Sequence, residues 1–282
     1  MVSDSKRFSG SIPENYHHYM VPLLFEPYSK HLVRELGHLQ GGPVLEIACG
    51  TGSVTGHLRK RLPRDVQLVA TDISSEMLEF AKRDLGHLQG LELRSADAMD
   101  LPFSSSSFEA VICQFGIMFL PDKRQGLSEI FRVLRGGGTA YVSTWSDIAH
   151  NELLDVANQA IQALDLKEPI SFTGGCRYGD VDSIRTDFEA SGFQDLEFSV
   201  VTKRSKAPGI ENAVNSLVNG TTLASKLDEQ DLLQAGTEAI RESYRSALVM
   251  GPCQHRCRRY SAKRRSQARR PLPLQIVGLP VV

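Results

Sequence analysis

The chain has 282 residues, of which 41% are hydrophobic and 23% are charged, and its formal net charge is −1. This composition is typical of a soluble globular protein with a sizeable core, either one large α/β domain with an insertion or two smaller domains. No apolar run is long enough to cross a bilayer, and residues 1–7 lead into polar residues instead of the apolar part of a secretory signal. We therefore expect no membrane span and a cytoplasmic location.

The distribution of charge argues against a nucleic-acid partner, and the cysteine content argues against disulfides and a metal site. Residues 251–270 hold eight Arg or Lys and no acid, and residues 271–282 hold no charge, so the first 250 residues carry −9. Such an acidic surface repels the phosphates of DNA and RNA, so no nucleic-acid partner is expected. The five cysteines are an odd number without the spacing of a disulfide framework, which predicts reduced thiols. One Cys/His cluster near residue 255 lacks a partner pair, so no metal is expected.

The N-terminal region is rich in aromatic and apolar residues that prolines interrupt. Its pattern predicts a short helix or turn over 12–25 and a helix over 26–36. The aliphatic run that ends at Ile47 then predicts a strand, and the glycine-bearing turn after it leads into a helix that Ser53 would cap. Such a turn aims backbone N–H groups at a ligand, and glycines allow the ligand to come close. We therefore expect a small nucleotide-like ligand here.

Residue spacing narrows the type of nucleotide. A dinucleotide-binding turn requires a small residue three positions after Gly52, where this chain has Thr55, and no Lys follows the glycines as a phosphate-binding loop requires. Glu46 is an acidic residue within the first strand, and Asp72 lies at the end of a second buried strand, twenty positions after Gly52. Doubly wound folds place a ribose-binding carboxylate at the latter position. The pattern favours a nucleoside with an uncharged diol.

The next segments alternate between strand and helix patterns, which predicts a parallel sheet. Strands are expected over 66–71, 91–94, 108–115, 139–145 and 196–202, and helices over 53–61, 75–85, 151–164, 181–191, 210–219 and 227–249. The predicted fold class is α/β, a Rossmann-like doubly wound sheet of mostly parallel strands with a helical cap insertion. The region after residue 250 is basic and poor in strand-forming residues, which leaves a seventh strand in doubt.

The order of motifs resembles the class I S-adenosylmethionine-dependent methyltransferases, and most closely the small-molecule branch called type 11. Residues 46–52, Glu-Ile-Ala-Cys-Gly-Thr-Gly, match that family's first motif, E/D-x-G-x-G-x-G, except at Ala48. Asp72 matches the ribose-binding acid, residues 97–99 fall where the family's Asp contacts the adenine amino group, and residues 134–138 resemble its L-x-x-G-G segment. The resemblance covers residues 16–198, and several motifs in order are far more specific than any one of them.

The resemblance implies a set of site residues for the cofactor S-adenosylmethionine. The implied cofactor-binding residues are Glu46, Ala48, Gly50, Gly52, Asp72, Ile73, Met77, Asp97, Ala98, Gln114 and Tyr19. The leading helices of the family fold over the cofactor, so the rings of Tyr16, His17, His18 and Tyr19 are candidates for contact with its sulfonium.

The acceptor of the methyl group would lie beyond the cofactor. Phe115, Trp145 and Tyr178 are the predicted residues of the substrate pocket, although Trp145 at a strand end is equally consistent with packing. His17, His18 and His150 are the candidates for a catalytic base, and the resemblance fixes none of them. The acceptor atom, the substrate and the oligomeric state are not defined by the sequence.

Four regions are expected: N-terminal lid helices over 1–37, an S-adenosylmethionine-binding Rossmann-like methyltransferase domain over 38–205, a helical cap over 206–250, and a basic, poorly ordered tail over 251–282. The expected function is transfer of a methyl group from S-adenosylmethionine to a small-molecule acceptor. Two alternatives stay open. Ala48 and the unusual tail suggest a cofactor-binding protein without activity, and an NAD-dependent oxidoreductase is disfavoured by Thr55.

Overall fold

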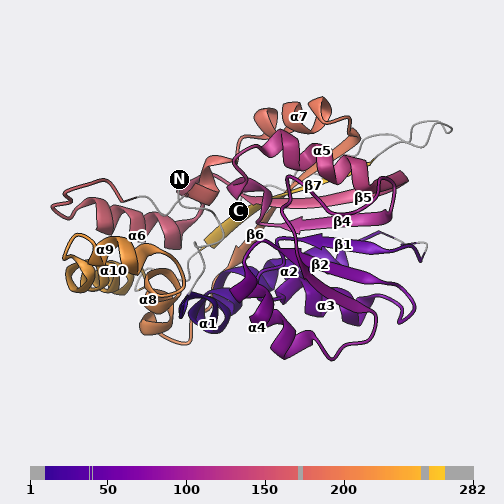
Figure 1. The fold of residues 1–282 in the computed structure, drawn as a ribbon. Coiled ribbons are helices and arrows are strands. Elements are labelled where there is room, and N and C mark those ends of the chain that lie inside the picture. Colours follow the sequence, from indigo (N-terminus) through magenta and orange to yellow (C-terminus); the bar gives the residue numbers. More distant parts are fainter. Residues whose placement is uncertain (1–9, 38, 40, 171–173, 249–253, 264–282) are drawn as a thin grey trace.

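The computed structural model describes residues 10–37, 39, 41–170, 174–248 and 254–263. A twisted sheet lies at the centre, helices cover both of its faces, and a further group of helices lies beyond one end of the strands (Figure 1). The expected Rossmann-like α/β class is confirmed.

The sheet has seven strands within the described residues, in the order β3-β2-β1-β4-β5-β7-β6. Their bounds are β1 Val44–Ile47, β2 Leu68–Asp72, β3 Leu91–Ser95, β4 Phe108–Gln114, β5 Leu134–Trp145, β6 Gln194–Arg204 and β7 Gln254–Lys263. The strands β1 to β5 pair in parallel, and β1 is buried along its whole length, as a strand covered on both faces must be. Strand order reverses between β1 and β4, and open α/β sheets bind ligands beside the carboxyl ends at such a switch.

Helices α2, α3 and α4 cover one face of the sheet, and α5 and α7 cover the other (Figure 1). Their bounds are α2 Glu26–Arg34, α3 Ser53–Arg61, α4 Ser75–Leu85, α5 Lys123–Val133 and α7 Val181–Ala190. Polar caps fix where three of them begin. The side chains of Ser74, Asp122 and Asp180 each accept a hydrogen bond from the backbone N–H three residues later, at α4, α5 and α7.

The N-terminal region is helical without a break over residues 12–34. Helix α1 Ile12–Asn15 continues directly into the π-helix η2 Tyr16–Phe25, which leads into α2. The π-helical bonding is visible at the end of η2, where the N–H of Glu26 donates to the carbonyl of Val21, five residues earlier. Pro22 lies inside η2 and has no N–H to donate. Wider π-helical turns change which side chains share a face, which matters for the site.

A second helical group lies beyond the carboxyl ends of the strands (Figure 1). It contains α6 Glu152–Gln162, α8 Ile210–Val218, α9 Leu223–Asp228 and α10 Leu233–Leu248. The single helix expected over 227–249 is wrong, because α9 ends at Asp228 and α10 begins at Leu233. Asp231 takes a left-handed φ of +61° in the turn between them, and the N–H of Leu232 bonds back to the carbonyl of Leu227. Among the described residues there are also three short 3₁₀ turns: η3 Ile117–Phe119, η4 Ile148–His150 and η5 Gly174–Arg177.

The basic segment forms the seventh strand, so the expectation of a tail without a strand is wrong for residues 254–263. Strand β7 runs antiparallel between β5 and β6, with register pairs that include Val142 with Tyr260 and Val200 with Arg258. A strand with neighbours on both sides gains two ladders of backbone hydrogen bonds, which outweighs its weak intrinsic preference for extended structure. Residues 249–253 and 264–282 lie outside the described residues.

Most of the buried apolar side chains form one large core between the sheet and the helices of both groups. A smaller cluster packs α2 and α3 against the opposite face of the sheet, around Leu32 and Leu58. Three cysteines, Cys49, Cys113 and Cys176, are buried free thiols, in agreement with the expected reduced state. Within the described residues, no helix combines the length and the apolar character needed to cross a membrane.

Candidate active site

The turn between β1 and α3 holds three residues with left-handed backbone conformation. Their φ angles are +54° at Ala48, +56° at Gly50 and +88° at Gly52. Gly50 lines a cavity at this edge of the sheet, and the nearest atom to a Cβ built there would be in the Tyr16 ring, 4.0 Å away. A Cβ at Gly52 would instead lie 2.5 Å from Cδ1 of Leu85. Gly50 thus leaves room for a ligand, whereas Gly52 leaves room for α4 to pack.

Gly52 also precedes α3 as its N-cap, so the expected capping role of Ser53 is wrong. The Ser53 hydroxyl lies 2.9 Å from Oε2 of Glu26 and 3.0 Å from Oγ of Ser29, both on α2. His57 Nε2 lies 2.9 Å from the other carboxylate oxygen of Glu26. These contacts tie the N-terminal helices to the start of α3 and so to the turn.

The cavity beside this turn has a volume of about 240 Å³. It extends from the carboxyl ends of β1, β2 and β4 to the helical group that contains α6, α8 and α9. Ten of the residues predicted for the site line it: Ala48, Gly50, Asp72, Ile73, Met77, Asp97, Ala98, Gln114, Phe115 and Trp145. The structure therefore gathers the acids, the small residues and the aromatic wall around one space.

Asp72 connects the end of β2 to the turn. Its Oδ2 accepts a hydrogen bond from the N–H of Gly50 at 2.8 Å, and its Oδ1 accepts one from the N–H of Ser74 at 2.9 Å. Burial raises the pKa of Asp72, and these N–H groups oppose the rise by stabilising the carboxylate. Each carboxylate oxygen has a second lone pair, so Asp72 can hold the turn and still accept hydrogen bonds from ligand hydroxyls.

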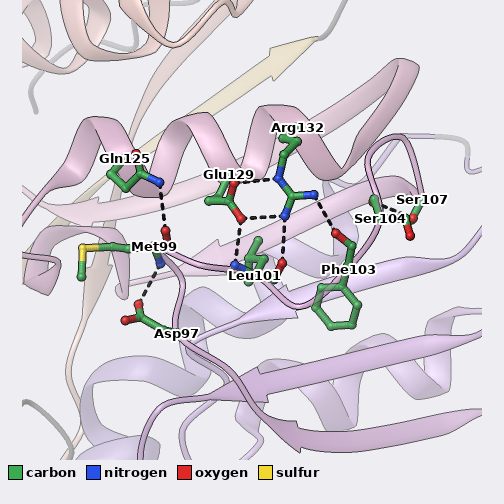
Figure 2. A network of polar contacts seen from close by, with 9 residues as sticks. All are labelled: Asp97, Met99, Leu101, Phe103, Ser104, Ser107, Gln125, Glu129 and Arg132. Carbon is green, nitrogen blue, oxygen red and sulfur yellow. Dashed lines mark hydrogen bonds and ion pairs between the residues drawn. The ribbon is translucent and has the colours of Figure 1, made fainter.

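Asp97 lies in a loop that α5 holds in place (Figure 2). Its Oδ1 accepts a hydrogen bond from the N–H of Met99 at 2.8 Å. Further along the loop, Glu129 Oε2 accepts from the N–H of Leu101 at 2.8 Å, and Arg132 donates to the carbonyl of Leu101 at 2.8 Å. Glu129 and Arg132 on α5 therefore bind the N–H and the carbonyl of Leu101, and so fix the backbone of the loop at this residue.

Two more contacts extend this network. Arg132 donates to the carbonyl of Phe103 at 2.6 Å, and Gln125 donates to the carbonyl of Met99 at 3.0 Å (Figure 2). Arg132 and Glu129 are joined by two hydrogen bonds of 2.6 and 2.7 Å, and the bonds from Arg132 are the main reason that the pKa of Glu129 is lowered. Sequence reasoning missed these residues, because their role depends on a contact between α5 and a loop that precedes it.

Buried acceptor atoms without a hydrogen-bond partner lie at the carboxyl ends of β1 and β4. Among the described residues these include Oε2 of Glu46 and Oε1 of Gln114, as well as the hydroxyl of Thr55. Glu46 is 2% exposed, and burial, with Asp72 nearby, raises the pKa of its carboxyl to about 8, although its interaction with Thr55 opposes the rise. Gln114 donates its amide N–H to Ser29 Oγ at 2.8 Å, which leaves its oxygen as an acceptor. A buried acceptor without a donor is costly unless a ligand supplies one.

The π-helix η2 presents Tyr16, Met20 and Leu24 to the cavity, each four residues after the one before. Tyr19 lies between them in sequence and is not among the lining residues, so the structure does not bring this predicted cofactor contact to the cavity. Burial and the nearby Asp72 carboxylate raise the pKa of Tyr16 well above its ordinary value. Tyr16, which was a candidate for ring contact, therefore takes the place expected of Tyr19.

None of the three candidate histidine bases lines the cavity. His17 packs on the Phe80 ring at 4.4 Å and lies 3.1 Å from Thr51 Oγ1, on the outer side of the turn. His18 is exposed and contacts the carbonyl of Glu14, and His150 is exposed beside Asp147 at 2.7 Å. Sequence proximity to the site suggested these residues, but the helix faces direct them outward.

Aromatic rings form the wall of the cavity that lies away from the acids. Phe115 and Trp145 stack with their centroids 4.1 Å apart and an interplanar angle of 18°, and Phe25 packs 5.4 Å from Phe115. Phe115 has a φ of +58°, which is a strained conformation for a bulky residue and is common at functional sites. Tyr178 is not part of this wall, because its hydroxyl donates to Asp187 Oδ2 at 3.0 Å and its ring lines a neighbouring pocket.

Residues of the helices beyond the sheet also line the cavity. Leu217 of α8, Thr221 and Thr222 of the link that follows, and Lys226 of α9 line it. The sequence predicts a cap over 206–250, and its amphipathic helices give no sign of which polar residues face inward. Within the described residues, no group of three or more His, Cys, Asp or Glu side chains is placed to hold a metal ion.

The arrangement fits S-adenosylmethionine. Asp72 and Asp97 offer carboxylates to hydroxyl and amino groups, Ile73 and Met77 offer apolar contact to a base, and the unpartnered oxygens of Gln114 and Glu46 call for N–H donors such as an ammonium group. Sheet order and turn together define a Rossmann-like domain, and the cavity resembles the cofactor site of class I methyltransferases.

Comparison with known proteins agrees with this class. Residues 44–138 match the family model described as "Methyltransferase domain", which confirms the resemblance to class I S-adenosylmethionine-dependent methyltransferases. The chain is 30% identical over 122 residues to the ubiquinone/menaquinone biosynthesis C-methyltransferase of Geotalea daltonii, covering 42% of this chain and 52% of that protein. It is 34% identical over 111 residues to the demethylmenaquinone methyltransferase of Staphylococcus aureus, covering 39% of this chain and 46% of that protein. The chain thus spans about half the length of these curated relatives.

Solved structures show the same fold. The phosphoethanolamine N-methyltransferase 2 of Haemonchus contortus, in complex with phosphomonomethylethanolamine and S-adenosylhomocysteine, aligns with a TM-score of 0.59 at 14% identity. The alignment covers 90% of this chain and 57% of that one.

Proposed function

We propose that this protein transfers the methyl group of S-adenosylmethionine to a small-molecule acceptor. One observation carries the proposal: a single cavity joins an acidic end, lined by Asp72 and Asp97 beside the left-handed turn after β1, to an apolar aromatic end lined by Phe115 and Trp145. A cationic nucleoside cofactor suits the first end, and an acceptor suits the second. When bound, the cofactor supplies an electrophilic methyl group on a sulfonium.

The residues of the chain would then bind and orient the cofactor and the acceptor, and exclude water from the cavity. We propose that Asp72 binds the ribose diol, that Asp97 and Ala98 lie against the adenine amino group, and that Ile73 and Met77 pack on the ring. Gln114 and Glu46 would accept hydrogen bonds from the amino group of the methionine part, directly or through water. These assignments use the carboxylates and the unpartnered oxygens that already lie in or beside the cavity.

At the aromatic end, the chain's contribution is alignment. Phe115 and Trp145 form a rigid stacked wall, and Phe25 and Leu24 close the space from the N-terminal helices. Holding the nucleophile in line with the sulfur and the methyl group lowers the barrier by several kcal/mol through positioning alone. The proposal needs no covalent intermediate, which agrees with the buried thiols of Cys113 and Cys176, whose pKa values burial raises to about 12.

The two alternatives lose support. The alternative of an inactive cofactor-binding protein rests partly on Ala48, which stands where the family has glycine. Ala48 adopts nearly the same φ as Gly50, so alanine at this position does not distort the turn. Residues 254–263 of the tail, which also motivated that alternative, form β7. The nicotinamide alternative requires a small residue three positions after Gly52, as in a dinucleotide-binding turn. The chain has Thr55 there, and its side chain is buried. We further propose a cytoplasmic location, supported by the free thiols, and no nucleic-acid partner, supported by the acidic charge of residues 1–250.

Titration with S-adenosylhomocysteine tests the cofactor assignment. We expect binding to the wild-type chain, and a loss of affinity of at least roughly tenfold in Asp72→Ala, because hydrogen bonds to a charged group contribute about 1.5–3 kcal/mol each. Since Asp72 also holds the turn, this variant should lose some stability as well, which urea unfolding would report. Asp65→Ala removes an exposed acid outside the cavity and is the matched control.

A methyl-transfer screen with S-adenosylmethionine on phenols, amines and thiols then tests activity. Tight binding without turnover on any acceptor would favour the inactive cofactor-binding protein. Selective binding of NAD with no affinity for S-adenosylhomocysteine would overturn the proposal.

A further inference from the structure

Four polar side chains form a continuous line of contacts from α2 to the cavity. Oε2 of Glu26 lies 2.9 Å from the hydroxyl of Ser53, and this hydroxyl lies 3.0 Å from the hydroxyl of Ser29. The Ser29 hydroxyl lies 2.8 Å from Nε2 of Gln114, which lines the cavity at the end of β4. Ser29 is 0% exposed, so water does not compete for its partners. These contacts therefore join an N-terminal helix to the carboxyl end of β4.

The first member of this line, Glu26, is a carboxylate at neutral pH. Its Oε1 lies 3.0 Å from the Lys30 ammonium group and 2.9 Å from Nε2 of His57. Burial alone would raise the pKa of this carboxyl, but hydrogen bonds from Lys30, His57 and Ser53 outweigh burial and lower the pKa below its ordinary value. An ionised carboxylate has no proton to donate, and it is a stronger acceptor than a hydroxyl. Ser53 therefore donates its single hydroxyl proton to Glu26.

The direction of the other hydrogen bonds follows from this one. The Ser53 oxygen can accept the proton of Ser29, and the carbonyl of Phe25, 3.1 Å from Ser29 Oγ, is a second acceptor for it. With either partner the single proton of Ser29 is used, and its oxygen keeps a lone pair for the amide N–H of Gln114. The opposite amide orientation would bring the oxygen of Gln114 to Ser29, which would then have to give up both acceptors. Oε1 of Gln114 is therefore the amide atom that stays unpartnered among the described residues.

We infer that Ser29 is a positioning residue, which fixes the amide of Gln114 so that Oε1 is kept as an acceptor for the ammonium group of the methionine part of the cofactor. This inference rests on the proposed function. Ser53 and Glu26 hold Ser29 in this role. An amide that turned freely could bind the ammonium group through its oxygen or the neighbouring carboxylate group of the cofactor through its nitrogen. The fixed amide offers its oxygen alone, so α2 contributes to the orientation of the methionine part without touching it.

Two ligands that differ in the amino group alone test this inference. One is S-adenosylhomocysteine, and the other is its analogue with hydrogen in place of the α-amino group. We expect the wild type to prefer S-adenosylhomocysteine by roughly tenfold, because hydrogen bonds to charged groups are among the stronger ones. Ser29→Ala frees the amide and should reduce this preference to about threefold or less, with affinity for the analogue within about twofold of wild type. Calorimetric titration of both ligands measures these ratios.

Gln114→Leu tests whether Ser29 acts through Gln114. This variant has a side chain of similar size without an amide, and it should lose the preference for the amino group by itself. Adding Ser29→Ala to Gln114→Leu should then change the preference no further. If Ser29 served the packing of α2 alone, its loss would weaken both ligands alike in both backgrounds.

Ser216→Ala is the matched control. Ser216 is also 0% exposed, and its hydroxyl donates to the carbonyl of Ala213 at 2.7 Å, but it does not line the cavity or contact Gln114. This variant should keep the wild-type preference. A measurement on the wild type is independent of how any variant folds: in ¹⁵N-labelled protein, the side-chain amide hydrogens of Gln114 should show nuclear Overhauser contacts to the β-hydrogens of Ser29, with and without S-adenosylhomocysteine.

The outcomes distinguish this inference from the proposed function. Failure of the wild type to bind S-adenosylhomocysteine would defeat the proposed function. Normal binding of S-adenosylhomocysteine, with equal affinity for the analogue or with an unchanged preference in Ser29→Ala, would overturn the role of Ser29 alone. Equal losses for the two ligands in Ser29→Ala, or absence of the contact between the two side chains in the wild type, would overturn it too.

Discussion

A Cβ atom built on Gly116 would lie 2.5 Å from the Cβ of Ala48 and 2.9 Å from Sγ of Cys113. The turn after β1 and the segment after β4 therefore touch at the switch point of the sheet. Gly116 has a φ of −101°, which any residue can adopt, so space and not backbone conformation requires glycine there. The family's glycine is replaced by Ala48, and Gly116 provides the room for the added methyl group.

This contact predicts that substitutions at the two positions are coupled. Gly116→Ala should lower the free energy of unfolding by about 1–3 kcal/mol through overpacking. The loss should be smaller in an Ala48→Gly background, although contact with Cys113 would keep it above zero. Ala48→Gly alone should stay within about 1 kcal/mol of wild type, because relief of left-handed strain is offset by the entropy of glycine in the unfolded chain. Urea unfolding of the four proteins measures the coupling.

Gly56→Ala on α3 is the control for this cycle, since its Cβ would make an ordinary 3.6 Å contact with Leu85. It should stabilise the protein, by up to about 1 kcal/mol, and its effect should add to that of Ala48→Gly. Strict additivity of Gly116→Ala and Ala48→Gly would contradict the steric account.

Glu46 predicts a dependence of stability on pH. Burial raises the pKa of its carboxyl from 4.5 to about 8, so between these values the folded chain keeps a proton that the unfolded chain has lost. The contribution of Glu46 to the free energy of unfolding is therefore complete below pH 4.5 and declines as the pH rises toward 8, by up to about 1.4 kcal/mol per pH unit. Glu46→Gln mimics the protonated form and should remove this decline.

Urea unfolding of the cofactor-free protein at several values between pH 5 and 8 would measure the slopes. The difference between wild type and Glu46→Gln cancels the contributions of other groups. Glu14→Gln replaces an exposed carboxylate and should leave the wild-type slope in place. Parallel slopes for wild type and Glu46→Gln would show that Glu46 is ionised in the folded protein.

The network in Figure 2 predicts that α5 controls the cofactor site at a distance. Arg132→Ala removes the donors to two loop carbonyls and leaves Glu129 without its charged partner. We expect the free energy of unfolding to fall by about 1–3 kcal/mol and the affinity for S-adenosylhomocysteine to fall severalfold, because Asp97 lies on the loop that is released. Calorimetric titration and urea unfolding would report the two effects.

Arg124→Ala provides the matched control on the same helix. Arg124 pairs with Asp187 at 2.6 Å at an exposed position and does not contact the loop, so its loss should change neither quantity by much. An unchanged cofactor affinity in Arg132→Ala would show that the loop keeps its shape without α5.

The sequence was sufficient to predict the parallel part of the sheet and ten of the residues that line the cavity. Helices 53–61 and 75–85 and the strands around them have clear periodicity, and the acid at Asp72 has a position fixed by the fold. The sequence could not show which face of the N-terminal helix meets the cavity, because the π-helical turns of η2 shift the side chains from their α-helical phase. Of the aromatic candidates in this segment, Tyr16 lines the cavity, whereas Tyr19, His17 and His18 do not.

Long-range contacts explain the other differences. Strand β7 forms because β5 and β6 offer unpaired backbone on both sides. No local sequence pattern in residues 254–263 predicts this pairing. The separation of α9 from α10 depends on a single left-handed residue, Asp231, in a stretch that otherwise reads as one helix. The inward position of Lys226 follows from how α9 packs, which helical periodicity alone does not determine.

Strand β7 comes last among the described elements yet separates β5 from β6 in the sheet. During synthesis on the ribosome, β6 has no neighbour with which to pair until residues 254–263 have emerged. Completion of this sheet must therefore wait for β7, and a nascent chain would expose the edges of β5 and β6 until that strand can insert between them.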